Sequence, residues 1–380
     1  MKPLLMRIYL DNNATTRVDP SVLDALSGSL RDIYGNASSI HKEGQAARRR
    51  LEEARESVAA LIGATAREVV FTSGGTESNN AAIFGVAATR GFHHIVTTAI
   101  EHPSVIEPLQ ELERRGHQLT IVPPSPDGTV DASAVISAIR EGTSFVAMML
   151  VNNETGVIQP VAEVASVCRA RGIHVHCDAV QAAGRLDLDV NALGVDTLAL
   201  SAHKIHAPKG VGALFVRKGL ALERLMFGGA QERRRRAGTE NVPLAAAFGV
   251  AAELARDSTA RPAIRARRDR LESELASEQI TVNGAGADRV ANTASITFRN
   301  ADGEGLVIAL DLDGVAVSTG AACSSGRVEP SHVLLAMGLT PDQARSTVRF
   351  SLSRMTTDEE VSGAVEALRS VLPRCLRGSG

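Results

Sequence analysis

Short apolar, β-branched runs alternate with longer amphipathic segments between about residue 15 and residue 260. Apolar runs separated by helical patterns are typical of a mostly parallel β-sheet covered by helices. We therefore expect an α/β fold built on a seven-stranded sheet. Its strands are expected at residues 68–71, 94–98, 119–123, 145–151, 173–178, 197–202 and 212–216.

One amphipathic helix is expected over residues 41–62. Its apolar positions Leu51, Ala54, Val58 and Leu61 are three or four residues apart, which places them on one helical face. Gly63 is expected to end this helix, because glycine adopts the left-handed conformation found after many helix C-termini.

Two domains are expected from the length and from a change of pattern after residue 260. A large domain would span 15–260, and a smaller α+β domain would combine 1–14 with 261–380. A helix at 242–256 would be followed by a charge-rich helix at 264–276, which would bridge the two. The smaller domain would contain strands near 280–284, 295–298, 315–319 and 348–353, with helices near 304–311, 331–337 and 358–371.

Composition excludes several classes of protein. Hydrophobic residues make up 44% and charged residues 22% of the 380 residues, a balance that favours a globular protein over a disordered one. A formal net charge of -2 gives no overall attraction to nucleic acid or to an anionic membrane. The N-terminus carries no secretory or membrane-spanning pattern, so we expect a cytoplasmic protein. The four cysteines lack metal-ligand spacing, and we expect free thiols and no metal.

The segment FTSGGTESNN joins a predicted strand to a helix that is expected to begin near Glu77. Paired glycines let a backbone approach a ligand, and the free amides of a helix start attract an anion. Gly75 and Thr76 could therefore bind a phosphate. An ordinary strand-to-helix turn explains the same residues when the segment is taken alone.

Asp178 ends the predicted strand in VHCDAVQ, at the edge where open α/β sheets bind their ligands. A buried carboxylate needs a partner, and a protonated pyridine nitrogen would be one. A helix N-cap aspartate is the simpler alternative.

Lys204 follows another apolar strand in ALSAHKIHAPKG. An amine at a strand end can bond an aldehyde cofactor, and burial lowers its pKa so that it can also act as a base. Lys209 competes for this role. We favour Lys204 because Ser201 and His203 on the same strand end could hold a phosphate.

These three segments occur in a fixed order, and the combination resembles the aspartate-aminotransferase-like fold of pyridoxal-phosphate enzymes, class V. Within it, the chain resembles the NifS-like and IscS-like cysteine desulfurases nearly end to end. The resemblance is carried by IYLDNNATT, FGGAQERRRRAGTENVP, STGAACSSGRVEPSHVL and VRFSLSR.

The resemblance implies pyridoxal 5'-phosphate as cofactor and a role for each matching residue. It implies that the phosphate is bound by Gly75, Thr76, Ser201 and His203, and by Thr239 of a neighbouring subunit. A homodimer would follow, and the basic run 233–236 would then lie at an interface rather than on a solvated loop. Lys204 would bind the cofactor, Asp178 would bind its ring nitrogen, and Gln181 would donate to its phenolic oxygen.

The substrate side is also implied by the resemblance. His102 would stack on the cofactor ring and could transfer protons. Asn153 would lie beside the ring and touch the carboxylate of the substrate, L-cysteine. Arg349 would form a bidentate pair with that carboxylate, with Arg354 as the alternative. Asn12 and Ala14 would line the substrate side.

Cys323 lies in the Gly/Ser-rich segment STGAACSSGR, whereas Cys168 and Cys177 lie in apolar segments. A thiol in a flexible loop is available for reaction. The resemblance implies that Cys323 takes sulfur from cysteine as a persulfide, releases alanine, and delivers the sulfur to an acceptor. That acceptor would be an iron-sulfur scaffold or a tRNA-thiolation protein.

Two alternatives to this function are a selenocysteine lyase and another class V aminotransferase. The chain also ends at CLRGSG, without the longer tail with which IscS-like members dock a scaffold. The identity of the acceptor therefore stays open, and we expect Cys375 to be an incidental thiol.

Overall fold

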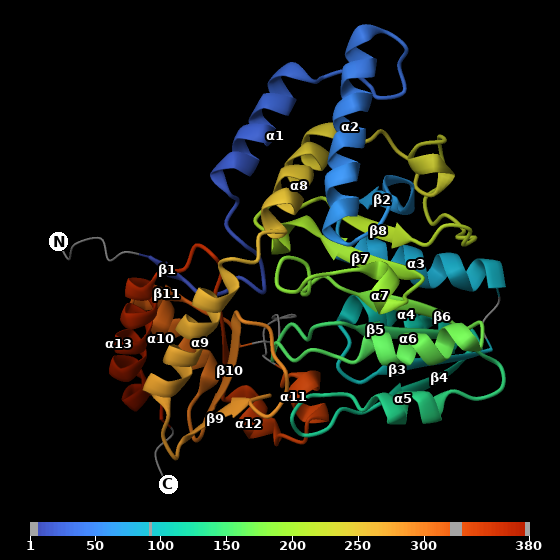
Figure 1. Cartoon of the computed structure of the whole chain (residues 1–380). Helices are drawn as coiled ribbons and strands as arrows, with labels where there is room; N and C mark the ends of the chain where they lie inside the picture. The colour runs from blue at the N-terminus through green and yellow to red at the C-terminus, as the bar shows by residue number, and fades with distance from the viewer. Residues whose placement is uncertain (1–6, 91–92, 320–328, 377–380) are drawn as a thin grey trace.

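The central element of the computed structural model, which describes residues 7–90, 93–319 and 329–376, is a seven-stranded sheet (Figure 1). Its strand order is β2-β8-β7-β6-β5-β3-β4. The strands are β2 (Val69–Thr72), β3 (His94–Thr98), β4 (Gln118–Val122), β5 (Thr143–Met149), β6 (His174–Asp178), β7 (Thr197–Ser201) and β8 (Gly212–Val216). Each expected strand is found, with bounds shifted by at most two residues.

The direction of the strands decides where the site lies. Strand β8 is antiparallel to both β2 and β7, and the other neighbouring pairs are parallel. Strands β2, β3, β5, β6 and β7 therefore end at the same edge of the sheet. The inner strands are buried at nearly every position, because helices cover both faces of the sheet.

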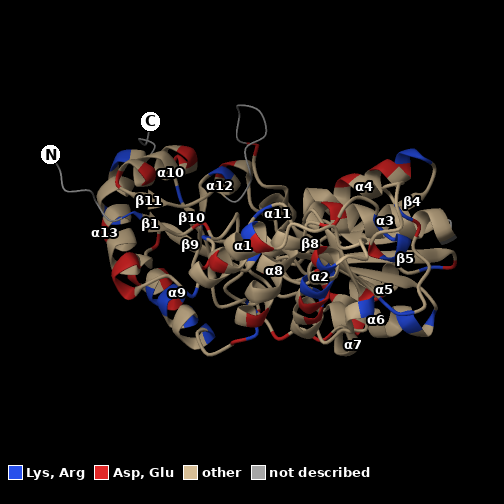
Figure 2. Cartoon of the chain, turned by 90° about the horizontal axis from the view of Figure 1, so that it is seen from above, with Lys and Arg blue, Asp and Glu red and all other residues tan. Residues whose placement is uncertain are grey.

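Helices α3 and α4 lie on one face of this sheet, and α6 and α7 lie on the other (Figures 1 and 2). The helices are α1 (Pro20–Asp32), α2 (Lys42–Leu61), α3 (Gly75–Arg90), α4 (Pro103–Arg114), α5 (Ala132–Ala138), α6 (Val161–Ala170), α7 (Val190–Leu193), α8 (Val242–Ala255), α9 (Arg261–Leu275), α10 (Gly303–Leu312), α11 (His332–Ala336), α12 (Pro341–Arg345) and α13 (Asp358–Cys375). Three short 3-10 helices are η1 (Ala66–Glu68), η2 (Ala202–Lys204) and η3 (Glu232–Arg234).

Helix α2 has the apolar face that its sequence predicts. Leu51, Ala54, Val58 and Leu61 are all buried. His41 caps the helix by accepting a hydrogen bond from the Gly44 amide. Gly63, just beyond the end of α2, has a φ of 65°, in the left-handed region that glycine adopts without strain. Helix α3, by contrast, begins at Gly75, two residues before the predicted position.

A second, antiparallel sheet has the order β12-β10-β9 and consists of β9 (Ile280–Asn283), β10 (Thr293–Phe298) and β12 (Thr347–Ser351). The strand expected near 315–319 is shorter. It is β11 (Val315–Ala316), which pairs with β1 (Ile8–Tyr9) in a separate parallel sheet. This pairing brings the N-terminal segment beside the C-terminal part of the chain (Figure 1).

Two large hydrophobic clusters form the core. One fills the space around the seven-stranded sheet, and the other lies between the small sheet, α9, α10 and α13. Val333, Leu334 and Met337, on and just after α11, belong to the first cluster, although they lie within 261–380. The division into 15–260 and 1–14 with 261–380 stays a prediction.

Charged residues of both signs are interspersed over the helices (Figure 2). Among the described residues, no helix combines the length and the apolar character that a membrane crossing requires.

Candidate active site

A hollow lies where β2, β3, β5, β6 and β7 end, and its cavity volume is about 220 Å³. It is lined by Gly75, Thr76, Asn79, His102, Ser104, Met149, Val151, Asn153, Asp178, Val180, Gln181, Ser201, His203 and Lys204. The fold thus brings together every cofactor residue predicted above except Thr239. We call this space the cofactor hollow.

Lys204 ends η2, directly after β7. Its Nζ donates to the backbone oxygens of Asn13 at 2.6 Å and Ala14 at 2.8 Å. Burial lowers the pKa of Lys204 to about 7, with Arg185 and Arg349 lowering it further against the attraction of Asp178. A substantial fraction of this amine is therefore uncharged and nucleophilic at neutral pH.

Asp178, at the end of β6, is held by two donors. Its Oδ2 accepts from Asn79 Nδ2 at 2.9 Å, and its Oδ1 accepts from the Val180 amide at 3.0 Å. Asn79 in turn bonds the ring of His176 at 3.0 Å. Asn79 was not predicted from the sequence, although it stands three residues beyond Thr76, one helical turn along α3.

The start of α3 forms one wall of the hollow. A Cβ atom on Gly75 would lie 2.7 Å from Cγ2 of Val180, so a side chain here would collide with Val180, two residues beyond the end of β6. Ser201 and His203 face the same region. Burial lowers the pKa of His203 to about 4, with further lowering by Lys204 and Lys209, so its ring is neutral at physiological pH.

His102 is the N-cap of α4, and its ring faces the cofactor hollow. Its Nδ1 accepts from the Ser104 amide at 3.0 Å. Desolvation lowers its pKa, opposed by Asp178 and assisted by Lys204 and His332. The ring is therefore predominantly neutral, with its basic lone pair on Nδ1 and its own proton on Nε2.

Arg349 lies on β12 and is 4% exposed. Its guanidinium pairs with Asp11 at 2.8 Å and donates to the Asn153 backbone oxygen at 2.9 Å. Its Nε is buried and has no hydrogen-bond partner among the described residues. Two of the five N–H donors of Arg349 are used in these bonds, and Asp11 neutralises the side chain.

The predicted Asn12 lies elsewhere. Its side chain donates to the Ser351 backbone oxygen at 2.8 Å, and it lines a neighbouring hollow. Asn13, not Asn12, contacts the residues of the cofactor hollow. Its backbone oxygen accepts from both Lys204 and Gln181, and its side chain bonds the Asn153 backbone and Thr293. The substrate role of Asn12 stays a prediction.

Thr239 lies outside the cofactor hollow of its own chain and lines a different space. The segment before it is anchored by a buried ion pair between Arg55 and Glu232 at 2.6 Å. Arg236 pairs with Glu77, on the first turn of α3, at 3.0 Å. Cys323, the predicted sulfur acceptor, lies outside the described residues.

Glu101 precedes His102 and was not singled out from the sequence. It is 1% exposed, and its Oε1 accepts from Thr98 at 2.6 Å and from the Met149 amide at 2.9 Å. Its Oε2 has no partner within the described part of the chain. Burial raises its pKa to about 8, so this acid is largely protonated at neutral pH.

The family model for class-V aminotransferases matches residues 8–363. The chain belongs to this family. It is 43% identical over 375 residues to a cysteine desulfurase of Enterobacter agglomerans, covering 97% of this chain and 94% of that protein. It is 45% identical to the cysteine desulfurase IscS of Anaeromyxobacter dehalogenans, covering 94% and 90% of the two chains.

A solved structure of a NifS-like protein has a TM-score of 0.91 and 36% identity, covering 96% of this chain and 99% of that one. The expected aspartate-aminotransferase-like fold is therefore confirmed, and so is the resemblance to NifS-like and IscS-like cysteine desulfurases.

Membership of the family implies a pyridoxal-phosphate-dependent enzyme, and the residues of the cofactor hollow fit that group. An uncharged amine, a fixed carboxylate and a helix N-terminus match its aldehyde, ring nitrogen and phosphate in turn. The side-chain amide of Gln181 uses one of its two N–H groups on the Asn13 backbone oxygen, so the second can donate to the phenolic oxygen.

Proposed function

We propose that this chain is a cysteine desulfurase that binds pyridoxal 5'-phosphate on Lys204 and converts L-cysteine to L-alanine. The observation that carries the proposal is Lys204 itself, with a pKa near 7, beside Asp178 in a hollow at the carboxyl edge of the sheet. The similarity to curated cysteine desulfurases supports this reaction over that of a selenocysteine lyase or another class V aminotransferase.

Each chain residue has a defined task in this proposal. Bound pyridoxal phosphate supplies an electron sink for the Cα–H and Cβ–S bonds of the amino acid. Asp178, fixed by Asn79 and Val180, balances the positive charge of the ring nitrogen. Gly75, Thr76, Ser201 and His203 bind the phosphate, and Gln181 donates to the phenolic oxygen.

Lys204 also handles protons. With L-cysteine bound, its free amine would take the proton from Cα of the substrate. Arg349 binds the substrate carboxylate, for which Asn153 supplies a further contact. A guanidinium suits this bidentate pairing in a way that an ammonium does not.

Cys323 is the proposed sulfur acceptor. Its thiolate attacks Sγ of the substrate, the Cβ–Sγ bond breaks, and the electron pair of that bond stays on the carbon side, which gains a proton to become the methyl group of alanine. The net exchange is L-cysteine and the Cys323 thiol for L-alanine and the Cys323 persulfide. We assign His102 as the group that takes the thiol proton.

The described cysteines are poor candidates for this step. Burial raises the pKa of Cys168 to about 12 and raises the pKa values of Cys177 and Cys375. Their thiolate forms are therefore scarce at neutral pH.

The proposal includes a homodimer in which Thr239 binds the phosphate of the neighbouring subunit. The separation of Thr239 from the cofactor hollow of its own chain is compatible with that role. It also includes a cytoplasmic location and transfer of the persulfide sulfur to a protein acceptor, an iron-sulfur scaffold or a tRNA-thiolation protein.

The decisive experiment compares Cys323→Ala with the matched control Cys375→Ala. Alanine release from cysteine and the mass gain of one sulfur atom on the protein should both disappear in C323A and persist in C375A. Undiminished alanine release by C323A would refute the persulfide step. Lys204→Ala should lose the visible absorption of the bound cofactor, whereas Lys209→Ala should keep it.

A further inference from the structure

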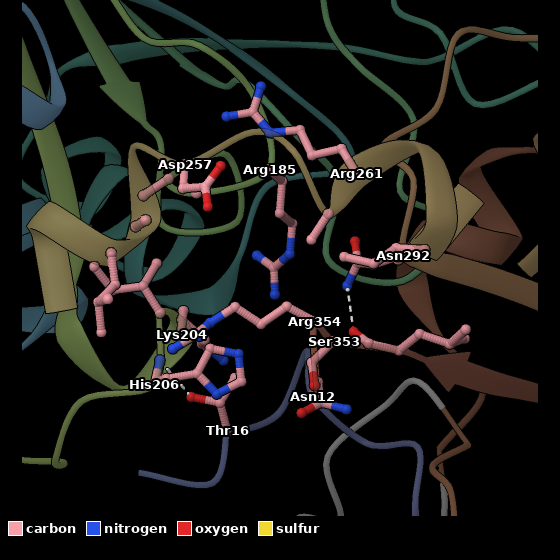
Figure 3. A pocket seen from close by; sticks show the side chains of 18 residues that line it. Asn12, Thr16, Arg185, Lys204, His206, Asp257, Arg261, Asn292, Ser353 and Arg354 are labelled. Atoms are coloured by element: carbon pink, nitrogen blue, oxygen red, sulfur yellow. Dashed lines mark hydrogen bonds between the residues drawn. The ribbon is translucent and has the colours of Figure 1, made fainter. Parts of the chain in front are cut away.

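A second hollow lies on the other side of Lys204 (Figure 3). Lys204 lines both spaces, and the cavity volume of the second one is about 70 Å³. It lies between the end of α8, the start of α9 and the segments around Asn12 and Asn292. Part of its wall is apolar, formed by Ala183, Leu254, Ala255, Ile264 and Leu352. We call it the junction hollow.

Arg185 extends into the junction hollow (Figure 3). Its guanidinium donates to the Gln181 backbone oxygen at 2.7 Å and to Asn13 Oδ1 at 3.1 Å, and both acceptors are neutral. Within residues 7–90, 93–319 and 329–376, no carboxylate pairs with Arg185 at 4 Å or less. A partly buried cation without an opposite charge is costly, and burial together with Arg349 lowers the pKa of Arg185 to about 10.

The other arginines of the junction hollow are already neutralised. Arg354 pairs with Asp19, and Arg261 pairs with Asp187 at 2.9 Å. The carboxylate of Asp257 accepts from the Thr259 amide at 2.9 Å. Asp257 stays ionised, because the hydrogen bonds from Thr259 lower the pKa of its carboxyl. Arg185 is thus the arginine of this space that lacks a carboxylate partner within the described residues, and Lys204 lies beside it.

We propose that the junction hollow binds a small oxyanion, either a carboxylate or an inorganic oxyanion, through charge-assisted hydrogen bonds from Arg185. Such an anion would supply the negatively charged partner that Arg185 lacks. The apolar walls of the hollow strengthen the attraction between the anion and the guanidinium. It would occupy a position distinct from the cofactor phosphate and from Arg349.

Binding would also change Lys204. Arg185 is the strongest of the charged neighbours that lower the pKa of Lys204. An anion on Arg185 offsets that charge, so the pKa of Lys204 rises and less of the amine is uncharged at neutral pH. An anion bound at Arg185 would therefore slow the attachment of pyridoxal phosphate to Lys204. This effect rests on the proposed function of Lys204.

The binding test uses the cofactor-loaded enzyme, in which the phosphate site is filled. Calorimetry at constant ionic strength measures sulfate and acetate binding to the wild type, Arg185→Gln, Arg185→Lys and the rim control Arg261→Gln. We expect saturable binding that weakens roughly ten-fold or more in R185Q, as loss of a charge-assisted bond predicts. R185K should retain part of the affinity, and R261Q should retain nearly all of it.

The two anions separate the sources of the ligand. Tighter acetate binding, preserved in Arg349→Ala, indicates an organic carboxylate, and tighter sulfate binding indicates an inorganic oxyanion. Absence of saturable binding by the wild type, or equal binding by R185Q and the wild type, overturns the proposal.

The coupling has its own readout. Sulfate should move the pH midpoint for attachment of pyridoxal phosphate to the cofactor-free wild type upward and leave that of R185Q unchanged. Equal midpoints in the wild type would remove the coupling without affecting the anion site. Loss of desulfurase activity plays no part in either measurement, so the two proposals fail independently.

Discussion

Lys204 donates from Nζ to the backbone oxygen of Asn13 at 2.6 Å. The N-terminal segment of the chain therefore holds an amine that follows β7 of the seven-stranded sheet. The side chain of Asn13 donates to the Asn153 backbone oxygen and to the Thr293 hydroxyl on β10. Asn13 thus connects Lys204, which follows β7 of the seven-stranded sheet, to β10 of the three-stranded sheet. Its neighbour Asn12, which the sequence suggested, is bound to the β12 backbone instead.

Attachment of the cofactor should depend on pH through Lys204. Its pKa is lowered to about 7, so the amine is protonated and unreactive below that pH and uncharged above it. The rate at which cofactor-free protein binds pyridoxal phosphate should therefore rise as the pH increases through about 7 and then level off. Stopped-flow absorption measures this rate. A rise that continues toward pH 10, the range of an ordinary lysine, would contradict the lowered pKa.

Asn79→Ala should weaken cofactor binding. The change removes the amide that donates to Asp178 at 2.9 Å, and a hydrogen bond to a charged group is worth enough to change affinity roughly ten-fold or more. Equilibrium titration with pyridoxal phosphate measures the change. Asn80→Ala is the matched control, because the Asn80 side chain bonds only backbone oxygens of Thr76 and Ser104. Similar losses in both variants would count against a role in orienting Asp178.

Arg349→Lys should raise KM for L-cysteine by roughly ten- to a hundred-fold, because an ammonium replaces bidentate pairing with a single point charge. The visible absorption of the bound cofactor should change little. Arg354→Lys should raise KM less, since Arg354 lines the junction hollow, whereas Arg349 contacts Asn153 of the cofactor hollow. If the larger effect on KM came from R354K, the substrate carboxylate would belong to Arg354.

Glu101→Gln should change how stability depends on pH. The folded-state pKa of Glu101 is raised from 4.5 to about 8, so between these values the folded protein binds a proton that the unfolded chain releases. Wild-type stability therefore falls with rising pH across this window because of Glu101. Glutamine mimics the neutral acid and removes that loss, so E101Q should gain stability relative to the wild type by a few kcal/mol by pH 8. Denaturant unfolding at pH 5 and pH 8 tests this, and a constant difference between the two proteins would argue against a protonated Glu101.

Local sequence patterns predicted the large sheet well. Runs such as residues 94–98 and 197–201 are buried at every position, because both faces of a parallel sheet are covered. Their β-branched and apolar residues made them recognisable as strands. The end of each run also located Asp178, Lys204 and the start of α3. These residues lie next to a strand in sequence, so the strand direction alone brings them to one edge.

Contacts between distant segments could not be read from the sequence. Asn79 orients Asp178 across 99 positions, and Asn13 holds Lys204 across 191 positions. Neither residue differs from an ordinary helical or loop asparagine until the chain folds. The short pairing of β1 with β11 likewise joins segments that lie far apart in the sequence, Ile8 with Val315 and Tyr9 with Ala316.

The sequence by itself determined which residue types could do the chemistry and placed them at strand ends, because periodicity and turn residues act over a few positions. Only the tertiary structure decided their charge and surroundings. The pKa of Lys204 falls because residues far along the chain desolvate it and set Arg185 and Arg349 beside it. Burial and electrostatic fields depend on distances in space, and a linear pattern does not contain those distances.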